Sequence, residues 1–167
     1  MISVYRFLLL LFFCSCSVGE PDPSDRLRNS YLVNGVGYLF TADAVKFQYL
    51  DFNRENPALC QIDFELKGIK RLGNELTLEI ERPKGCKRTY ELVWDGNWQE
   101  SVPRRMQIYL TALSTPCVGG TETELDVIKV DLATALQEAP KDLFTIYLRE
   151  HCSVRDFNCV GNCDVSI

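Results

Sequence analysis

Apolar and polar residues alternate along much of this chain with a period of two, which is the pattern of a strand buried on one side. Three such runs follow one another in the middle of the sequence. Their apolar positions are Cys60, Ile62, Phe64 and Leu66, then Leu76, Leu78 and Ile80, then Tyr90, Leu92 and Trp94. Successive strands with one apolar face each need a second sheet to cover that face.

Further strands are predicted on both sides of these runs. The segment 31–40 is apolar but contains Gly35 and Gly37, which favours a bulged strand or two short ones. One short helix is expected over 131–139, where Asp131 can act as the cap and Pro140 follows. The other strand-like runs span 44–52, 106–113, 125–132 and 143–149. Many short strands with almost no helix indicate an all-β sandwich or barrel.

The first nineteen residues have the pattern of a secretory signal peptide. Arg6 precedes an apolar block, and small residues follow that block. Cleavage fits after Ser17 or after Gly19. The alternative is a bacterial lipoprotein signal with Cys16 lipidated, although Phe13 fits the aliphatic position of such a signal poorly.

The rest of the chain divides by composition into three parts. Residues 20–30 are polar and predict a flexible leader, residues 31–152 form the β-domain, and residues 153–167 form a cysteine-containing tail. No later apolar run has the length of a transmembrane helix. We therefore expect a secreted, extracellular protein without a membrane span.

Removal of the signal peptide leaves an even number of cysteines. They are Cys60, Cys86, Cys117, Cys152, Cys159 and Cys163. After a signal peptide, an even count favours disulfides over metal ligands or catalytic thiols. The sequence leaves open whether Cys159 and Cys163 pair with each other or with another chain.

The charge balance of the chain is acidic. The full sequence has a formal net charge of −5, with 18 basic and 23 acidic side chains. Loss of Arg6 with the signal peptide brings the net charge to about −6. Nucleic acids and anionic membranes attract basic surfaces, so neither is expected as the main partner.

No constellation of residues predicts catalysis, a metal site or a cofactor. His151 is the sole histidine, and its neighbour Cys152 points to the opposite face of a strand. Cys159 and Cys163 have the spacing of half a zinc site, but disulfide bonding or a cross-link is favoured in a secreted chain. The segment 51–57 imitates the start of a calcium loop without its glycine or its closing glutamate. A hydrolase with paired carboxylates would require a deep acidic cleft.

One series of residues resembles a known family. Cys86, Tyr90, Asp95, Gly96 and Trp98 form the pattern C-x-x-x-Y-x-x-x-x-D-G-x-W, which resembles the central segment of CUB domains. Upstream, the segment 59–64 is similar to the strand that carries the first cysteine of that family. Downstream, segments 117–119 and 144–152 are similar to its Cys-Gly turn and its closing cysteine strand. The resemblance covers residues 35–152.

The resemblance implies a fold and a set of disulfides. The fold is a two-sheet antiparallel β-sandwich, a CUB-like jelly roll stabilised by disulfides, with at most one short helix. The implied bonds join Cys60 with Cys86 and Cys117 with Cys152, which leaves Cys159 with Cys163.

The family's calcium site is not expected in this chain. Many CUB domains hold calcium with a glutamate before the second cysteine and an aspartate three residues after it. Glu81 matches the glutamate, but Thr89 stands in the place of the aspartate. A hydroxyl brings no charge to a hard cation, so we predict no calcium.

The expected function is recognition of an extracellular protein or glycan, without catalysis. Asp95, Gly96, Asn97 and Trp98 are the candidate contact residues, because loops that carry aromatic residues often form contact surfaces. Packing of Trp98 in the core is the alternative for that residue. The alternative function is a lipocalin-like carrier of small apolar ligands, although its early Gly-x-Trp motif is missing. The sequence does not indicate an oligomeric state.

Overall fold

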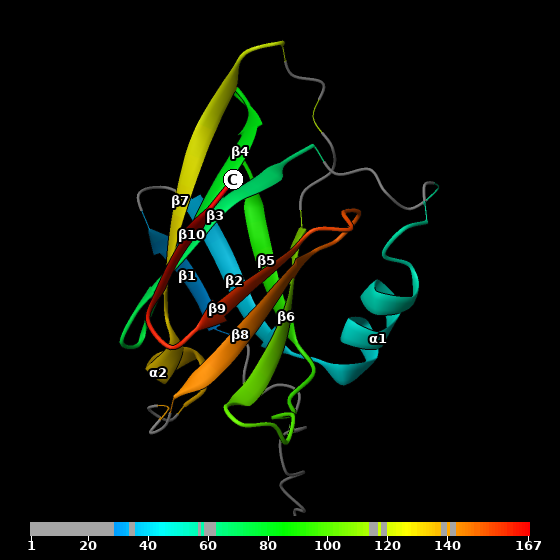
Figure 1. Ribbon diagram of the computed structural model, residues 1–167. Coiled ribbons are helices and arrows are strands. Elements are labelled where there is room, and N and C mark those ends of the chain that lie inside the picture. The colour runs from blue at the N-terminus through cyan, green and yellow to red at the C-terminus, as the bar shows by residue number, and fades with distance from the viewer. Residues whose placement is uncertain are drawn as a thin grey trace, which may run out of the picture.

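The computed structural model describes residues 29–33, 36–56, 58, 63–113, 117, 120–137, 140 and 143–167, and the side chains only from residue 36 onwards. These residues form two β-sheets that face each other, with two short helices (Figure 1). The elements are β1 (Asn29–Val33), β2 (Val36–Ala42), α1 (Ala44–Phe52), β3 (Glu65–Leu72), β4 (Glu75–Pro83), β5 (Thr89–Trp94), β6 (Arg104–Ala112), β7 (Thr123–Asp131), α2 (Leu132–Ala135), β8 (Phe144–Glu150), β9 (Asp156–Val160) and β10 (Cys163–Ser166).

The larger sheet is mixed, with strands in the order β1-β2-β5-β6-β8-β9. Strand β2 runs parallel to β5, with Phe40 opposite Leu92, and β6 runs parallel to β8, with Ile108 opposite Leu148. Its other pairs are antiparallel. The expectation of a purely antiparallel sandwich is therefore wrong. Parallel neighbours need long crossovers, and here α1 with the β3–β4 hairpin, and then β7 with α2, supply them.

The smaller sheet is antiparallel, with strands in the order β10-β3-β4-β7. Gly73 at φ +60° allows the tight turn between β3 and β4. Consecutive strands of the chain are divided between two sheets, which differs from the neighbour-to-neighbour order of an up-and-down lipocalin barrel.

The core lies between the two sheets and uses the alternating positions of the sequence. Leu76, Leu78 and Ile80 of β4 face Tyr90 and the other inward residues of the larger sheet, and all are fully buried. The apolar face predicted for these strands is confirmed.

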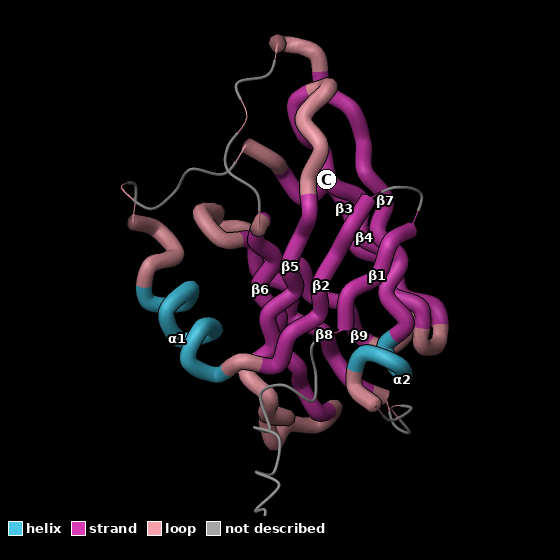
Figure 2. The backbone as a smooth tube through the Cα atoms, turned by 180° about the vertical axis from the view of Figure 1, so that it is seen from behind, coloured by secondary structure: helices cyan, strands magenta, loops and turns pink. Residues whose placement is uncertain are grey.

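The segment 44–52 is a helix, and its prediction as a strand is wrong. The Asp43 carboxylate accepts a hydrogen bond from the Lys46 backbone N–H at 2.8 Å and caps the first turn. Phe47 and Leu50, three residues apart, are buried against Val93 and Tyr109 on the outer face of the larger sheet. Figure 2 shows α1 beside β5 and β6, outside the sandwich.

The predicted helix after β7 is also present, as the single turn α2. Asp131 caps it by accepting hydrogen bonds from the N–H groups of Ala133 and Thr134. The described residues thus contain two short helices instead of at most one, because 44–52 adds the second.

The disulfide pairing differs from the one that the CUB resemblance implied. Cys86 is bonded to Cys117, with their Cα atoms 5.9 Å apart, so neither the Cys60–Cys86 nor the Cys117–Cys152 bond forms. Cys152 is itself disulfide-bonded, and Cys60 lies outside the described residues. Disulfides are typical of proteins from an oxidising compartment.

The expected Cys159–Cys163 bond is confirmed, and it links the two sheets. These residues lie on β9 and β10, which are edge strands of the larger and the smaller sheet respectively. The segment 153–167, expected as a tail beyond the domain, therefore completes both sheets. The expected signal peptide 1–19 lies outside the described residues, as do all but two residues (29 and 30) of the expected leader 20–30. None of the helices that the structure describes is long and apolar enough to cross a membrane.

Candidate functional site

The loop between β5 and β6, residues 95–103, begins with a tight polar turn. The Asp95 carboxylate accepts a hydrogen bond from the backbone N–H of Asn97 at 3.0 Å. Gly96 has φ +82°, a conformation that favours glycine, and both Gly96 and Asn97 are exposed. The first three candidate contact residues therefore form one polar turn, which is exposed at Gly96 and Asn97.

Trp98 fixes this turn to the core from below. Its half-buried ring packs edge-to-face on Trp94 and Phe144, with ring centroids 5.9 and 5.2 Å apart. The Trp94 indole N–H donates a hydrogen bond to the Asn97 carbonyl at 3.1 Å. Trp98 was expected either to belong to the contact surface or to pack in the core. It packs against the core and supports the turn formed by Asp95, Gly96 and Asn97.

The second half of the loop is held by the backbone. Gln99 and Arg105 exchange two backbone hydrogen bonds, at 2.9 and 3.2 Å, and the Ser101 hydroxyl donates to the Pro103 carbonyl at 2.6 Å. Between them, Val102 is fully exposed. The loop is therefore fixed by its backbone and by Ser101, and it presents an exposed apolar side chain, Val102, as well as the polar turn.

The N-terminus of α1 lies next to this loop. The Asp43 N–H donates a hydrogen bond to the Trp94 carbonyl at 2.8 Å, so the helix begins beside the residue that precedes the turn. The helix is fixed to the sheet at two further points. Lys46 forms an ion pair with the buried Glu91 at 2.5 Å, and Asp51 accepts a hydrogen bond from the Tyr109 hydroxyl at 2.5 Å. Burial, reinforced by this bond to Asp51, raises the pKa of Tyr109 to about 12.

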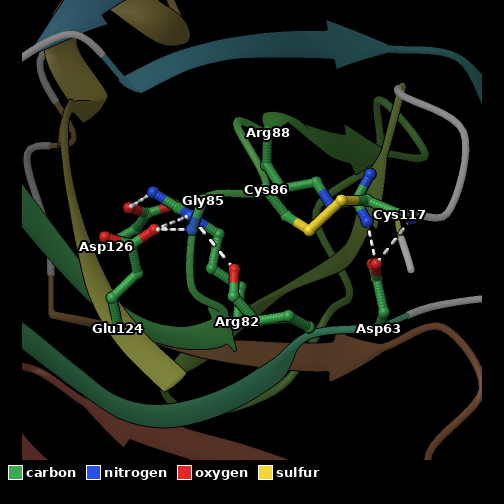
Figure 3. The surroundings of a disulfide bond; sticks show 9 residues. Asp63, Arg82, Gly85, Cys86, Arg88, Cys117, Glu124 and Asp126 are labelled. Carbon is green, nitrogen blue, oxygen red and sulfur yellow. Dashed lines mark hydrogen bonds and ion pairs between the residues drawn. A yellow bond between two sulfur atoms is a disulfide. The ribbon is translucent and has the colours of Figure 1, made fainter. Parts of the chain in front are cut away.

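At the opposite end of β5, the Cys86–Cys117 bond lies between two polar clusters (Figure 3). On one side, the Asp63 carboxylate binds the Arg88 guanidinium and accepts the Cys117 N–H at 2.9 Å. Both Arg88 and the disulfide are buried or nearly so. The disulfide and the internal Arg88–Asp63 ion pair therefore both fix the start of β5.

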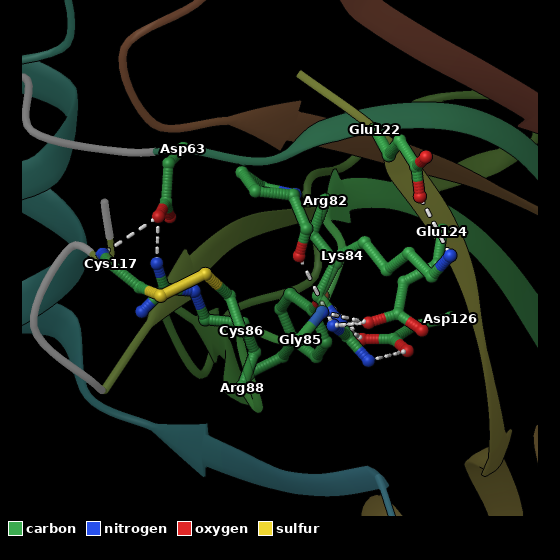
Figure 4. Close-up of polar contacts among 12 residues, drawn as sticks. Asp63, Arg82, Lys84, Gly85, Cys86, Arg88, Cys117, Glu122, Glu124 and Asp126 are labelled. Atoms are coloured by element: carbon green, nitrogen blue, oxygen red, sulfur yellow. Dashed lines mark hydrogen bonds and ion pairs between the residues drawn. A yellow bond between two sulfur atoms is a disulfide. The ribbon is translucent and has the colours of Figure 1, made fainter. Parts of the chain in front are cut away.

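The cluster on the other side is centred on Arg82 (Figure 4). Its guanidinium donates to both oxygens of the Asp126 carboxylate, at 2.5 and 2.9 Å, and also pairs with Glu124. The buried Tyr90 hydroxyl donates to Asp126 at 2.8 Å, and burial is the first cause that raises the pKa of Tyr90. The charged groups of this cluster satisfy one another's hydrogen bonds, so the cluster has a structural role at this end of β5.

The residues of the rejected catalytic pair lie in another buried region. His151 is 7% exposed, and its Nε2 atom has no hydrogen-bond partner among the described residues. Burial lowers the pKa of His151 and raises the pKa of the adjacent, buried Glu150, whose carboxylate accepts the Leu66 N–H at 2.8 Å. Because Cys152 is disulfide-bonded, it has no thiolate with which to act as a nucleophile.

The residues compared with the CUB calcium site lie on different sheets. Glu81, on β4 of the smaller sheet, faces Lys67 at 3.4 Å, whereas Thr89 begins β5 of the larger sheet. In the part of the chain that the structure describes, no three His, Cys, Asp or Glu residues form a group that could hold a metal ion.

Comparison of the chain with family models, with curated proteins and with solved structures found no match.

Two features of this region were not predicted from the sequence. Val102 was not singled out, and nothing in its local pattern marks it as exposed. Helix α1 was also missed, because the alternation in 44–52 predicts a strand. The signal that could have corrected this was Asp43, a good N-cap residue directly before the apolar run.

Proposed function

We propose that this chain is a secreted, non-catalytic binding protein that recognises an extracellular protein or glycan through the β5–β6 loop, residues 95–103. The observation that carries the proposal is the construction of that loop. Trp98 and the Gln99–Arg105 backbone pair fix it from within, while Gly96, Asn97 and Val102 remain exposed.

A loop that is ordered before binding loses little conformational entropy when a partner arrives. Rigid scaffolds that carry binding residues on loops are a common arrangement of recognition proteins. The disulfides support the oxidising environment that the proposal requires. The proposal does not depend on the CUB resemblance, which implied two disulfides that this chain does not form.

The test is a binding screen of the secreted protein against an array of extracellular ectodomains and a glycan array. Binders are then compared between the wild type and two loop variants, Asn97→Lys and Val102→Asp. Leu72→Asp serves as the matched control, because Leu72 is also an exposed apolar residue but lies on β3. We expect the loop variants to bind at least about tenfold more weakly, as for contacts at the centre of an interface, and the control to bind normally. Equal binding by all variants, or no binder in either array, would contradict the proposal.

A further inference from the structure

The outer face of the larger sheet carries polar side chains near the start of β6. Met106 and Ile108 of this strand are part of the core. Because side chains alternate along a strand, Arg105 and Gln107 lie on the opposite, outer face. Tyr109, the next outward residue, is covered there by helix α1. Arg105 and Gln107 therefore lie on the same face as α1, at the end of β6 that adjoins the β5–β6 loop.

The neighbouring strands extend this polar surface. Tyr147 on β8 is directly opposite Gln107, and Asn158 on β9 is directly opposite Tyr147. Residues that are directly opposite in a sheet share a face, so these three form one row across β6, β8 and β9 (Figure 1). Gln107 and Tyr147 are half-buried, and Asn158 is exposed. We call Arg105, Gln107, Tyr147 and Asn158 the β6–β9 patch.

Arg105 carries a positive charge that no acceptor in this part of the structure satisfies. Its guanidinium lies over the Tyr147 ring, 4.8 Å from the ring centroid, and the residue is half-buried. Among the described residues, no oxygen accepts a hydrogen bond from this guanidinium. Nε is the only one of its unpartnered nitrogens that is buried, so the two Nη atoms are accessible to solvent. The ring therefore holds two free donors in place at the surface.

The other arginines show how unusual this is. With the exception of the exposed Arg104, each arginine whose side chain the structure describes donates to an oxygen of the protein. These residues are Arg54, Arg71, Arg82, Arg88, Arg149 and Arg155. A partly buried charge is costly unless it is paired, and an aromatic ring stabilises a cation without supplying an acceptor oxygen. An anion at the Nη atoms of Arg105 would complete the pairing.

We propose that the β6–β9 patch binds the carboxylate of an acidic sugar, and that this sugar belongs to the glycan recognised through the β5–β6 loop. The inference rests on the proposed function, because Gln99 of the loop holds Arg105 by two backbone hydrogen bonds, at 2.9 and 3.2 Å. The two Nη atoms of a guanidinium match the two oxygens of a carboxylate. The amides of Gln107 and Asn158 donate to and accept from sugar hydroxyl groups, and neither has another partner among the described residues.

Charge and side-chain chemistry narrow the class of ligand. The chain has a formal net charge of −5, so it repels a long polyanion. A ligand with one carboxylate is affected mainly by the nearest charges, because salt screens distant ones, and the patch supplies the unpaired Arg105. The row Gln107, Tyr147 and Asn158 offers amides and a hydroxyl but no aliphatic side chain. It therefore suits the hydroxyl groups of a sugar better than the apolar anchors of a peptide.

The test is an NMR titration of the secreted protein with sialyllactose and with methyl glucuronide, two sources of a sugar carboxylate. Lactose is the neutral counterpart, and a short glutamate peptide is the acidic counterpart without sugar. Titration up to about 20 mM covers the weak affinity that a few exposed polar contacts provide. We expect at least one acidic sugar to shift the amide signals of the β6–β9 patch, and neither lactose nor the peptide to do so.

Variants then assign the binding to Arg105. Arg105→Gln should weaken it at least about tenfold, because it removes a charged pair of hydrogen bonds. Arg105→Lys should recover part of the loss, since it keeps the charge but not the planar fork. Asn158→Ala, at an exposed position, should weaken binding about threefold. The matched control is Arg104→Gln, which removes the same charge from the adjacent exposed residue, and it should bind as the wild type does. Circular dichroism confirms that each variant is folded.

Several results would overturn this inference. They are equal shifts with lactose, shifts with the peptide alone, and binding that Arg105→Gln leaves unchanged or that Arg104→Gln weakens as much. If neither acidic sugar binds while array binders still depend on Asn97 and Val102, the carboxylate site is wrong and the proposed function stands. If an acidic sugar binds through Arg105 but the loop variants bind their array partners normally, the carboxylate site is supported and recognition through the loop is contradicted.

Discussion

Charged side chains lie inside this sandwich, at the ends of its core. Arg82 and Asp126 are 9% and 5% exposed, and they satisfy each other and Tyr90. The alternation in 125–132 predicted a strand but not which face is inward. Leu125 is half exposed, whereas Asp126 points inward. Period alone could not show this, because the buried aspartate is stabilised by an arginine more than 40 residues away in the sequence.

Asp126→Ala should destabilise the protein strongly. The substitution leaves the Arg82 guanidinium and the Tyr90 hydroxyl buried without their carboxylate partner. Breaking a buried ion pair from one side typically costs about 3–5 kcal/mol in the free energy of unfolding. Urea denaturation followed by tryptophan fluorescence measures the change.

The matched control is Glu122→Ala, which removes one partner of the exposed Lys84–Glu122 pair. Exposed pairs contribute little, so its unfolding curve should lie close to that of the wild type. If Asp126→Ala were no more destabilising than Glu122→Ala, the structural role of the Arg82 cluster would be wrong.

At the scale of elements, most strands follow from the sequence and α1 does not. Strands β4 to β8 lie where alternating or apolar runs predicted them. In 44–52, however, apolar residues occur both at period two and at the helical spacing of Phe47 and Leu50. The helix is favoured over a strand because the side chains of Val93 and Tyr109 cover Phe47 and Leu50. Val93 and Tyr109 lie on strands that are distant in the sequence, so the local pattern of 44–52 cannot predict this packing.

The cap of α1 provides a direct check on its assignment as a helix. Asp43→Ala removes the acceptor of the Lys46 N–H and should lower the free energy of unfolding by about 1 kcal/mol. Asp43→Asn should preserve most of the stability, because asparagine caps helices as well as aspartate does. Both variants are measured by urea denaturation. Equal destabilisation by Ala and Asn would show that the charge of Asp43, and not its capping bond, is what matters.

At the scale of the whole molecule, the sequence predicts two facing sheets but not how their strands connect. The parallel pairs β2–β5 and β6–β8 depend on crossovers, in which the chain leaves the larger sheet and returns to it. The alternation of apolar and polar residues does not predict these crossovers. The cysteines predicted disulfides by their even number, yet six cysteines allow 15 pairings. The CUB resemblance selected one of these, and two of its three bonds are wrong. The candidate loop was found through its Asp-Gly turn, whereas the inward direction of Trp98 depended on its contact with Phe144.

At this scale we make one proposal about function, recognition through the β5–β6 loop. This proposal depends on a disulfide frame, in which Cys86–Cys117 fixes the start of β5 and Cys159–Cys163 links the edges of the two sheets. That frame is the central claim of the account.

Mass spectrometry of the secreted protein, digested with trypsin without reduction, tests the frame most directly. Cleavage after lysine and arginine leaves Cys86 on peptide 85–87, Cys117 on peptide 106–129, and both Cys159 and Cys163 on peptide 156–167. We predict that a disulfide joins peptide 85–87 to peptide 106–129, and that reduction separates the two peptides. Peptide 156–167 should carry an internal disulfide, so its mass should increase on reduction. Peptide 85–87 joined to peptide 55–67, which carries Cys60, would restore the CUB-like pairing and contradict the fold described for this chain.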